Sequence, residues 1–421
     1  MKERPDFQIP VEWSLVRMDD LALKLKAGGT PNRKNKSYFG GDIPFVLIDD
    51  MTSSGVYLNS TKETISREGL DACSAWIAPE NTVLLSMYAT IGVTVITTFP
   101  VATNQAILAI IPHENCDREY LSFCLQAHKA HLTRLNVEST QKNINKGIVS
   151  SFPIPLPPLP EQKKIAHILS TVQRAIEAQE RIIQTTTELK KALMHKLFTE
   201  GLRNEPQKQT EIGLVPESWD VVELGTLAKV GNGSTPKRAN EAYWEGGTIP
   251  WLNSTKIHDR FITEAEQFVT PQAIKECHLP KVAPNSMLIA ITGQGKTLGN
   301  SAITRIETCI NQHLAYAQFH SPKIVPDFVL WFMQTRYDYL RSIALGGGST
   351  KGALTCGFLK TLPIPAPSTD EQKEIVTVFQ TLEDKQDSAA SKQSALQDLF
   401  RTLLHELMTA KTRVNDFPLT A

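Results

Sequence analysis

One stretch of the sequence suggests phosphate chemistry. The run Ala290-Ile291-Thr292-Gly293-Gln294-Gly295-Lys296-Thr297 follows an apolar, strand-like segment and loosely matches a loop that cradles nucleotide phosphates. The residues after Thr297 make a poor helix start, because a glycine follows within two positions. We therefore expect a turn between two strands. A loop in which Lys296 and backbone N–H groups contact a nucleic-acid phosphate, and a nucleotide-binding loop, are the alternatives.

Other groups of reactive side chains do not fit a catalytic pattern. Glu161-Gln162-Lys163 and Glu371-Gln372-Lys373 imitate half of a nuclease metal site, but each opens a long helix, where a carboxylate suits the helix dipole. A possible metal cluster is better explained by a core-facing cysteine and surface histidines; its members are His113, Cys116, Cys124, His128 and His131. No Ser/His/Asp order and no cofactor loop is present. The sequence predicts no catalytic residue and no metal site.

Polar loops are the remaining candidates for chemistry, and they occur in pairs. Residues 32–36 correspond to 237–240, and residues 139–143 correspond to 349–351. Asn, Gln, Arg, Lys and Thr are the side chains that contact base edges and phosphates. The candidate nucleic-acid contacts in these and neighbouring loops are Arg33, Lys34, Lys36, Tyr88, Thr90, Gln105, Thr140, Lys142, Lys237, Arg238, Lys296, Thr297, Gln312, Thr350 and Lys351.

Composition limits the class of protein. The 421 residues suffice for two or three domains, and 41% hydrophobic residues can form cores. The 44 Lys and Arg balance the 44 Asp and Glu, so any nucleic-acid site must be local. Six scattered cysteines without a CxxC pair, and the lack of a long apolar run, predict a cytoplasmic protein with no membrane span.

An internal repeat organises the chain. Trp13 recurs as Trp219, and the Gly-Gly-x-Ile-Pro-aromatic run ending at Phe45 recurs at Trp251. The run Pro-Ile-Pro at 153–155 and the Glu-Gln-Lys at 161–163 both return 210 residues later. The protein is therefore one unit of about 210 residues written twice.

Each copy begins with short β-rich runs separated by turn residues and followed by a helix, over about 119–135 in the first copy. A proline-rich stretch, which disfavours helix and cannot donate to a sheet, ends this α+β domain. From Glu161 to about Gly201 no Pro or Gly interrupts a heptad pattern of apolar residues, and the second copy repeats it. The predicted seam consists of Ile165, Leu169, Val172, Ile176, Ile183, Leu193 and Leu197 in the first helix and Ile375, Phe379, Leu382, Leu396, Leu399, Leu403 and Leu407 in the second.

A single helix of about 40 residues spans about 60 Å and cannot hide such a stripe alone. We expect the two helices to pair antiparallel, with the two α+β domains at opposite ends and related by a pseudo-twofold axis. The predicted organisation is a first domain over 1–155, a helix over 156–202, a second domain over 203–365, a helix over 366–412 and a tail over 413–421.

The doubled Trp, Thr-Pro and Gly-Gly-x-Ile-Pro-aromatic pattern, and Pro-Ile-Pro followed by Glu-Gln-Lys at the start of a long helix, resemble the specificity subunit of type I restriction-modification systems over about residues 8 to 412. The resemblance implies two target recognition domains, each reading half of a split, asymmetric site in double-stranded DNA, held apart by antiparallel helices. It also implies that the chain is non-catalytic.

The resemblance further implies partners that carry the chemistry. Two methyltransferase subunits using S-adenosylmethionine and restriction subunits using ATP and Mg²⁺ would dock on this chain, which itself would bind no cofactor. The outer faces of the paired helices would serve the methyltransferases, through Arg174, Arg181, Lys191, Lys385 and Arg401. A P-loop-like nucleotide-binding enzyme and a coiled-coil adaptor without DNA contact are the alternative functions.

Overall fold

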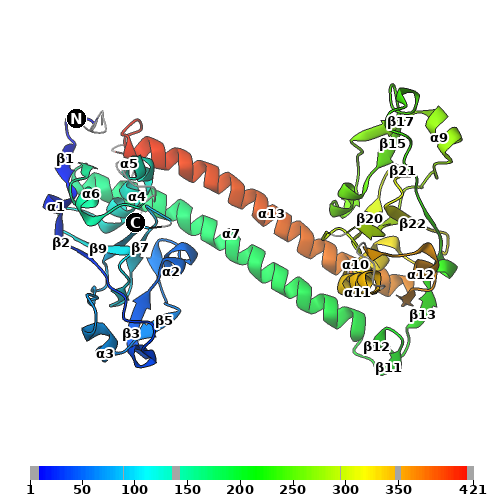
Figure 1. Ribbon diagram of the computed structural model, residues 1–421, viewed down its shortest axis with the longest axis horizontal. Coiled ribbons are helices and arrows are strands. Elements are labelled where there is room, and N and C mark those ends of the chain that lie inside the picture. The colour runs from blue at the N-terminus through cyan, green and yellow to red at the C-terminus, as the bar shows by residue number, and fades with distance from the viewer. Residues whose placement is uncertain (1–8, 89, 135–142, 294, 347–351, 415–421) are drawn as a thin grey trace. The chain divides into compact units, whose positions relative to one another are not determined.

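The computed structural model describes residues 9–88, 90–134, 143–293, 295–346 and 352–414. The chain divides into two compact units, Met1–Ile183 with Ser388–Ala421, and Gln184–Asp387. Two long helices, α7 (Leu159–Thr199) and α13 (Thr369–Met408), each contribute to both units (Figure 1). The prediction of two long helices in corresponding places is therefore confirmed. We call the globular part before α7 the first domain and the part between α7 and α13 the second domain.

The first domain is built on a five-stranded sheet of order β2-β9-β6-β7-β4, beside a three-stranded sheet of order β5-β3-β8 and a two-stranded sheet β1-β10. Its elements are β1 (Ser14–Arg17), α1 (Met18–Leu21), β2 (Ala22–Ala27), η1 (Lys36–Tyr38), β3 (Phe39–Val46), α2 (Ile48–Ser53), β4 (Tyr57–Leu58), β5 (Glu63–Ile65), α3 (Arg67–Asp71), β6 (Val83–Ser86), β7 (Thr94–Thr97), β8 (Ala102–Thr103), β9 (Ile107–Pro112), α4 (Arg118–Ala127), α5 (Lys129–Arg134), α6 (Lys146–Ser150) and β10 (Pro153–Leu156).

The second domain repeats this topology, with sheets β14-β22-β18-β20-β16, β17-β15-β21 and β13-β24, and it also contains two short pairs, β11-β12 and β19-β23. Its elements are β11 (Gln207–Thr210), β12 (Gly213–Pro216), β13 (Asp220–Glu223), α8 (Leu224–Leu227), β14 (Ala228–Asn232), η2 (Glu241–Tyr243), β15 (Ile249–Leu252), η3 (Ser254–His258), β16 (Phe261–Ile262), β17 (Gln267–Val269), α9 (Pro271–Cys277), β18 (Ser286–Ala290), β19 (Thr292–Gly293), β20 (Ser301–Thr304), β21 (Cys309–Ile310), β22 (Leu314–Phe319), α10 (Pro326–Thr335), α11 (Tyr337–Leu345), β23 (Gly352–Ala353), α12 (Cys356–Lys360) and β24 (Pro363–Ala366).

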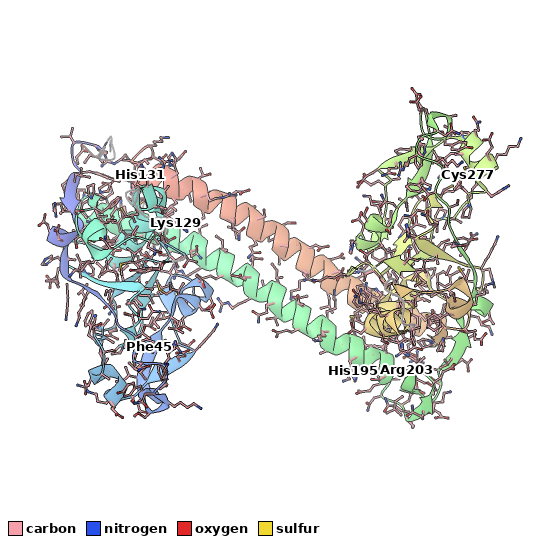
Figure 2. All side chains as sticks on the ribbon, viewed as in Figure 1. Phe45, Lys129, His131, His195, Arg203 and Cys277 are labelled. Atoms are coloured by element: carbon pink, nitrogen blue, oxygen red, sulfur yellow. The ribbon has the colours of Figure 1, made fainter. Side chains whose placement is uncertain are left out.

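Apolar residues cover both faces of each five-stranded sheet, which explains the uninterrupted apolar runs of its central strands. In β6, Val83 and Leu85 face one core with α4, α7 and α13, and Leu84 faces a second core. Phe45 on β3, labelled in Figure 2, is fully buried in a third core under the three-stranded sheet. Its neighbour Val46 belongs to the second core, so β3 joins the three-stranded sheet to the five-stranded one.

The Glu-Gln pair that opens each long helix fastens that helix to its domain. Glu161 is 4% exposed and accepts a hydrogen bond from the Trp13 indole at 3.1 Å, and the buried Glu371 accepts one from Trp219 at 3.3 Å. Gln372 is fully buried and makes three hydrogen bonds to backbone groups. Helix-start electrostatics alone therefore do not explain the motif, because the Glu contacts the tryptophan near the start of its domain and the Gln contacts backbone groups just before α10 and α13.

In each unit, residues just beyond the end of one long helix contact the buried glutamate at the start of the other. In the first unit the Arg413 guanidinium donates to both Glu161 carboxylate oxygens, at 2.8 and 3.1 Å. In the second unit the Leu202 N–H donates to Glu371 at 3.1 Å. In each unit, therefore, the first turn of one long helix contacts the end of the other, as antiparallel pairing requires.

The contacts between the two long helices are apolar near each domain and polar in the middle of the helices. Ile165 and Leu169 pack with Leu403 and Leu407 in the first unit, and Phe198 stacks on Phe379 with ring centroids 6.0 Å apart in the second. The other predicted seam residues are buried or half-buried, namely Val172, Ile176, Ile183, Leu193, Leu197, Ile375, Leu382 and Leu396. The prediction for Leu399 is wrong: it is 45% exposed, and Phe400 contacts Phe123 instead.

Two local expectations are also wrong. The predicted helix over 119–135 is two helices, because His128 leaves helical geometry at φ −96° and ψ 13° and ends α4; Leu135 lies outside the described residues. The Pro-Ile-Pro runs do join sheets: Pro153 to Leu156 form β10, which within the described part of the chain pairs with β1 in a two-stranded sheet. Proline fits there because a strand in a two-stranded sheet has one edge on which no N–H is needed.

Candidate nucleic-acid interface

A threonine–glutamine contact occupies the same place in both domains. Thr30 donates its hydroxyl proton to the Gln105 side-chain oxygen, and Thr235 does the same to Gln312. Each threonine follows the first strand of the five-stranded sheet, and each glutamine precedes its second strand in order, β9 or β22. Both glutamines are exposed polar groups held in a fixed direction by a partner, as a hydrogen-bonding surface requires.

In the first domain the loop after Thr30 carries three cations. Arg33 donates to both Glu63 oxygens, at 3.3 and 3.1 Å, and its guanidinium lies 5.2 Å from the ring centre of Phe39. Lys34 and Lys36 are exposed. The loop therefore presents two lysine charges and an arginine whose charge faces a carboxylate.

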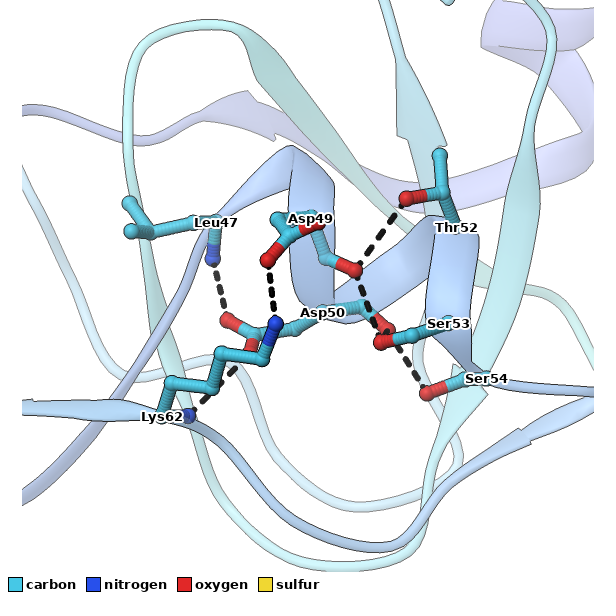
Figure 3. Close-up of polar contacts among 7 residues, drawn as sticks. All are labelled: Leu47, Asp49, Asp50, Thr52, Ser53, Ser54 and Lys62. Carbon is cyan, nitrogen blue, oxygen red and sulfur yellow. Dashed lines mark hydrogen bonds and ion pairs between the residues drawn. The ribbon is translucent and has the colours of Figure 1, made fainter. Parts of the chain in front are cut away.

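The backbone at Glu63 is fixed by a buried carboxylate. Asp50 is 3% exposed and accepts from the Leu47 N–H at 2.8 Å and from the Lys62 N–H at 3.1 Å (Figure 3). The Lys62 ammonium pairs with Asp49. These contacts hold the start of α2 against the chain entering β5, so that the Glu63 carboxylate stands in a defined position beside Arg33.

The equivalent loop of the second domain holds its arginine on tryptophan. The Arg238 guanidinium lies 3.8 Å from the ring centre of Trp244 and 5.1 Å from that of Trp251. It donates to the Gln267 side-chain oxygen at 2.5 Å. Arg238 and Lys237 are exposed, so both charges remain available on this surface.

The loops between the central hairpin strands contain the other described candidates. Tyr88 is 39% exposed, and Thr90 is half-buried with no hydrogen-bond partner for its hydroxyl among the described residues. Lys296 is exposed; its carbonyl accepts from the Tyr337 hydroxyl at 2.6 Å. Thr297 contacts His258 Nε2 at 3.1 Å. Thr140, Lys142, Thr350 and Lys351 lie outside the described residues.

The loop over 290–297 has the structure of a hairpin connection. β18 and β20 pair antiparallel, Thr292 and Gly293 form the short strand β19, and the next regular element is β20 and not a helix. A phosphate cradle places its glycine-rich loop at a helix N-terminus. The expected turn between two strands is therefore confirmed, and this geometry does not fit the nucleotide-binding alternative.

Two members of the suspected metal cluster, Cys124 and His128, are in contact at the end of α4. The His128 ring nitrogen Nδ1 lies 2.8 Å from the Cys124 carbonyl oxygen, and both residues are buried. The expectation of a surface histidine is thus wrong for His128, whose pKa burial lowers below its usual value, while it holds for the exposed His131. Burial also raises the pKa of the Cys116 thiol to about 12. Within the described residues, no group of three or more His, Cys, Asp or Glu could hold a metal ion.

The proposed partner-docking cations lie on the long helices. All five are exposed, and two make local contacts: Arg174 with the Ser170 carbonyl at 3.3 Å and Arg401 with Asp398. The remaining three are Arg181, Lys191 and Lys385. None of the helices in the described ranges is long and apolar enough to cross a membrane.

The sequence did not predict the side chains that contact Arg33 and Arg238. Arg33 contacts Glu63 and Phe39, and Arg238 contacts Gln267 and Trp244. The repeat contained a usable signal, because Phe39 and Trp244 are the aromatic residues of the aligned Tyr-Phe and Tyr-Trp pairs. No local pattern marked Glu63 or Gln267. Only strand register, which places each beside the same position of β3 or β15, identifies them as equivalent.

Two domains of one topology, each with polar and cationic loops at matching positions, define a protein with two related binding domains and paired helices. A family model described as "Type I restriction modification DNA specificity domain" matches residues 10–187 and again 216–397. The chain therefore belongs to the family of type I restriction-modification specificity subunits, as its sequence resemblance indicated.

Relatives in this family are similar in sequence over most of the chain. The type I restriction enzyme MjaIX specificity subunit of Methanocaldococcus jannaschii is 27% identical over 75% of this chain and 74% of its own length. The MjaVIII specificity subunit of the same organism is 23% identical over 99% and 96%. A crystal structure of the S subunit of the type I restriction-modification system of M. genitalium shares the fold, with a TM-score of 0.61, 16% identity and coverage of 97% and 98%.

Proposed function

We propose that this chain reads a bipartite, asymmetric site in double-stranded DNA, with one half-site recognised by each domain. The observation that carries the proposal is the doubled surface. A Thr–Gln contact and an arginine over an aromatic ring stand at matching positions of both domains, while the residues around them differ. Related scaffolds with different loops fit two half-sites of different sequence.

The chemistry belongs to partner subunits in this proposal. Two methyltransferase subunits that modify adenine would bind S-adenosylmethionine, and restriction subunits would use ATP and Mg²⁺; the chain itself would be non-catalytic and bind no cofactor. The exposed cations of α7 and α13 are the proposed docking side chains for the methyltransferases. Because DNA and these partners are cytoplasmic in a bacterial or archaeal cell, we place the complex in the cytoplasm.

A domain exchange tests the assignment. Residues 1–155 are replaced by the equivalent segment of a relative with a different specificity, and the methylated sequence is mapped in cells that supply the partner subunits. The expected result is a change in one half-site only. The reciprocal exchange of residues 203–365 is the matched control and should change the other half. The proposal would be contradicted if one exchange changed both half-sites. It would also be contradicted if both exchanges left the methylated sequence unchanged, which is the result expected of an adaptor without DNA contact.

A further inference from the structure

The two arginines at matching positions of the two domains differ in the charge of their partners. Strand register establishes the equivalence: Glu63 is the cross-strand neighbour of Phe45, and Gln267 is that of Trp251. Arg33 donates to a carboxylate, whereas Arg238 donates to a neutral amide oxygen. The Arg33 guanidinium thus forms an ion pair with a carboxylate, whereas Arg238 forms none among the residues that the structure describes.

The second domain also places its arginine over tryptophan and not over phenylalanine. Arg238 lies over two tryptophans, and the Trp face attracts a cation more strongly than the Phe face that Arg33 contacts. The Trp244 indole donates to the Lys237 carbonyl at 3.2 Å, and the Trp251 indole donates to the Ser234 carbonyl at 3.2 Å. Phenylalanine has no N–H with which to make such a contact. The loop that carries Arg238 is therefore fastened before any ligand binds.

Free donors remain on both guanidinium groups. A guanidinium has five N–H donors, of which Arg33 directs two at Glu63 and Arg238 directs one at Gln267. Both arginines are exposed and neighbour further exposed cations, Lys34 in the first domain and Lys237 in the second. A phosphate oxygen is the ligand that fits an exposed, planar, charged donor set beside a lysine.

We propose that Arg33 and Arg238 contact DNA backbone phosphates at the two half-sites, and that the residue at position 63 or 267 sets how strongly each domain holds the backbone. The inference rests on the proposed function and assigns a role within it. The second domain is the strong phosphate-binding domain because the hydrogen-bond partner of its arginine is a neutral amide and not a carboxylate. The first domain binds phosphate more weakly, because Glu63 competes for the guanidinium and repels the anion.

Exchanging Glu and Gln at positions 63 and 267 tests the proposal. The full chain is assembled with its methyltransferase partner, and binding to a duplex carrying its methylated sequence is measured by fluorescence anisotropy from roughly 50 to 200 mM salt. Gln267→Glu should weaken binding roughly threefold to tenfold and lower the salt slope by about 0.9, the loss of one phosphate contact. Glu63→Gln should strengthen binding and raise the slope by a similar amount. Gln267→Glu should cost less binding in an Arg238→Gln background than in the wild-type chain, because the carboxylate at position 267 then only repels the anion and has no guanidinium for which to compete.

Matched controls separate the local effect from net charge. Gln209→Glu on the exposed strand β11 and Glu80→Gln in an exposed loop make the same charge changes, and neither residue contacts Arg33 or Arg238 in the structure. Binding changes equal to those of the controls would overturn the proposal. Altered base preference without a change in slope would also overturn it, because that result indicates a base contact. If the wild-type complex shows no sequence-specific binding at all, the proposed function fails instead.

Discussion

Replacing Gln372 with methionine should sharply destabilise the second unit. Gln372 is fully buried; its side-chain oxygen accepts from the Val325 N–H at 2.7 Å, and its amide donates to the Lys323 and Pro367 carbonyls, both at 2.8 Å. Methionine keeps the volume but leaves three backbone groups without partners. At about 1 kcal/mol net for each hydrogen bond, with a further penalty for buried groups left unpaired, the expected loss is about 3 to 4 kcal/mol.

Urea unfolding followed by tryptophan fluorescence measures this loss as a lower midpoint at constant slope. Gln162→Met is the matched change in the first unit, because Gln162 also makes three such contacts, at 2.7, 3.0 and 2.8 Å. Gln184→Met is the control: Gln184 is exposed and donates to Glu188 on its own helix, so the loss should stay below about 0.5 kcal/mol. A loss from Gln372→Met below about 1 kcal/mol would refute the reasoning that these glutamines join the helices to the domains.

Three further outcomes are expected. Acidification from pH 7 to 5 should lower the free energy of unfolding of the first unit, because burial lowers the pKa of His128, so that the unfolded chain takes up the proton near pH 6.5 and the folded chain does so at lower pH. The loss of stability should be at most about 1.4 kcal/mol per pH unit. Unfolding measured across this pH range should show a smaller loss for His128→Gln. A thiol reagent should modify the half-buried Cys277 on α9 well before Cys309, whose pKa burial raises to about 11, as mass spectrometry of the native protein can check. Inserting four residues after both Thr185 and Asp387 adds about 6 Å to each helix, so methylation mapping should find a spacer about two base pairs longer with unchanged half-sites.

The repeat made much of the fold predictable. A heptad pattern without Pro or Gly over 40 residues has few alternatives to a long helix, and α7 and α13 lie where the pattern predicted them. The failures are places where tertiary contacts outweigh local preference. Pro155 lies in a strand because β10 needs only one paired edge. The helix predicted over 119–135 is interrupted at His128, whose backbone leaves helical geometry and whose ring contacts the Cys124 carbonyl and the Phe152 ring.

The candidate site was predictable as a set of loops but not as a set of contacts. Residue type identified Arg33 and Arg238, since cationic loops at repeated positions are visible in the sequence. It could not show that Arg33 pairs with the carboxylate of Glu63, 30 residues further along the chain, whereas Arg238 donates to the neutral amide of Gln267. That difference depends on which strand lies beside β3 and β15, which is a property of the sheet and not of the local sequence. The domain boundaries and the DNA-contacting roles remain predictions.

The central claim is that this chain alone determines a bipartite DNA sequence for its partners to modify. Genome-wide adenine methylation mapping, in cells that carry the partner subunits with and without this chain, tests it most directly. We expect one asymmetric motif of two half-sites separated by a spacer of fixed length, fully methylated when the chain is present and unmethylated when it is absent. An unchanged methylation pattern, or loss of a single uninterrupted motif, would contradict the account.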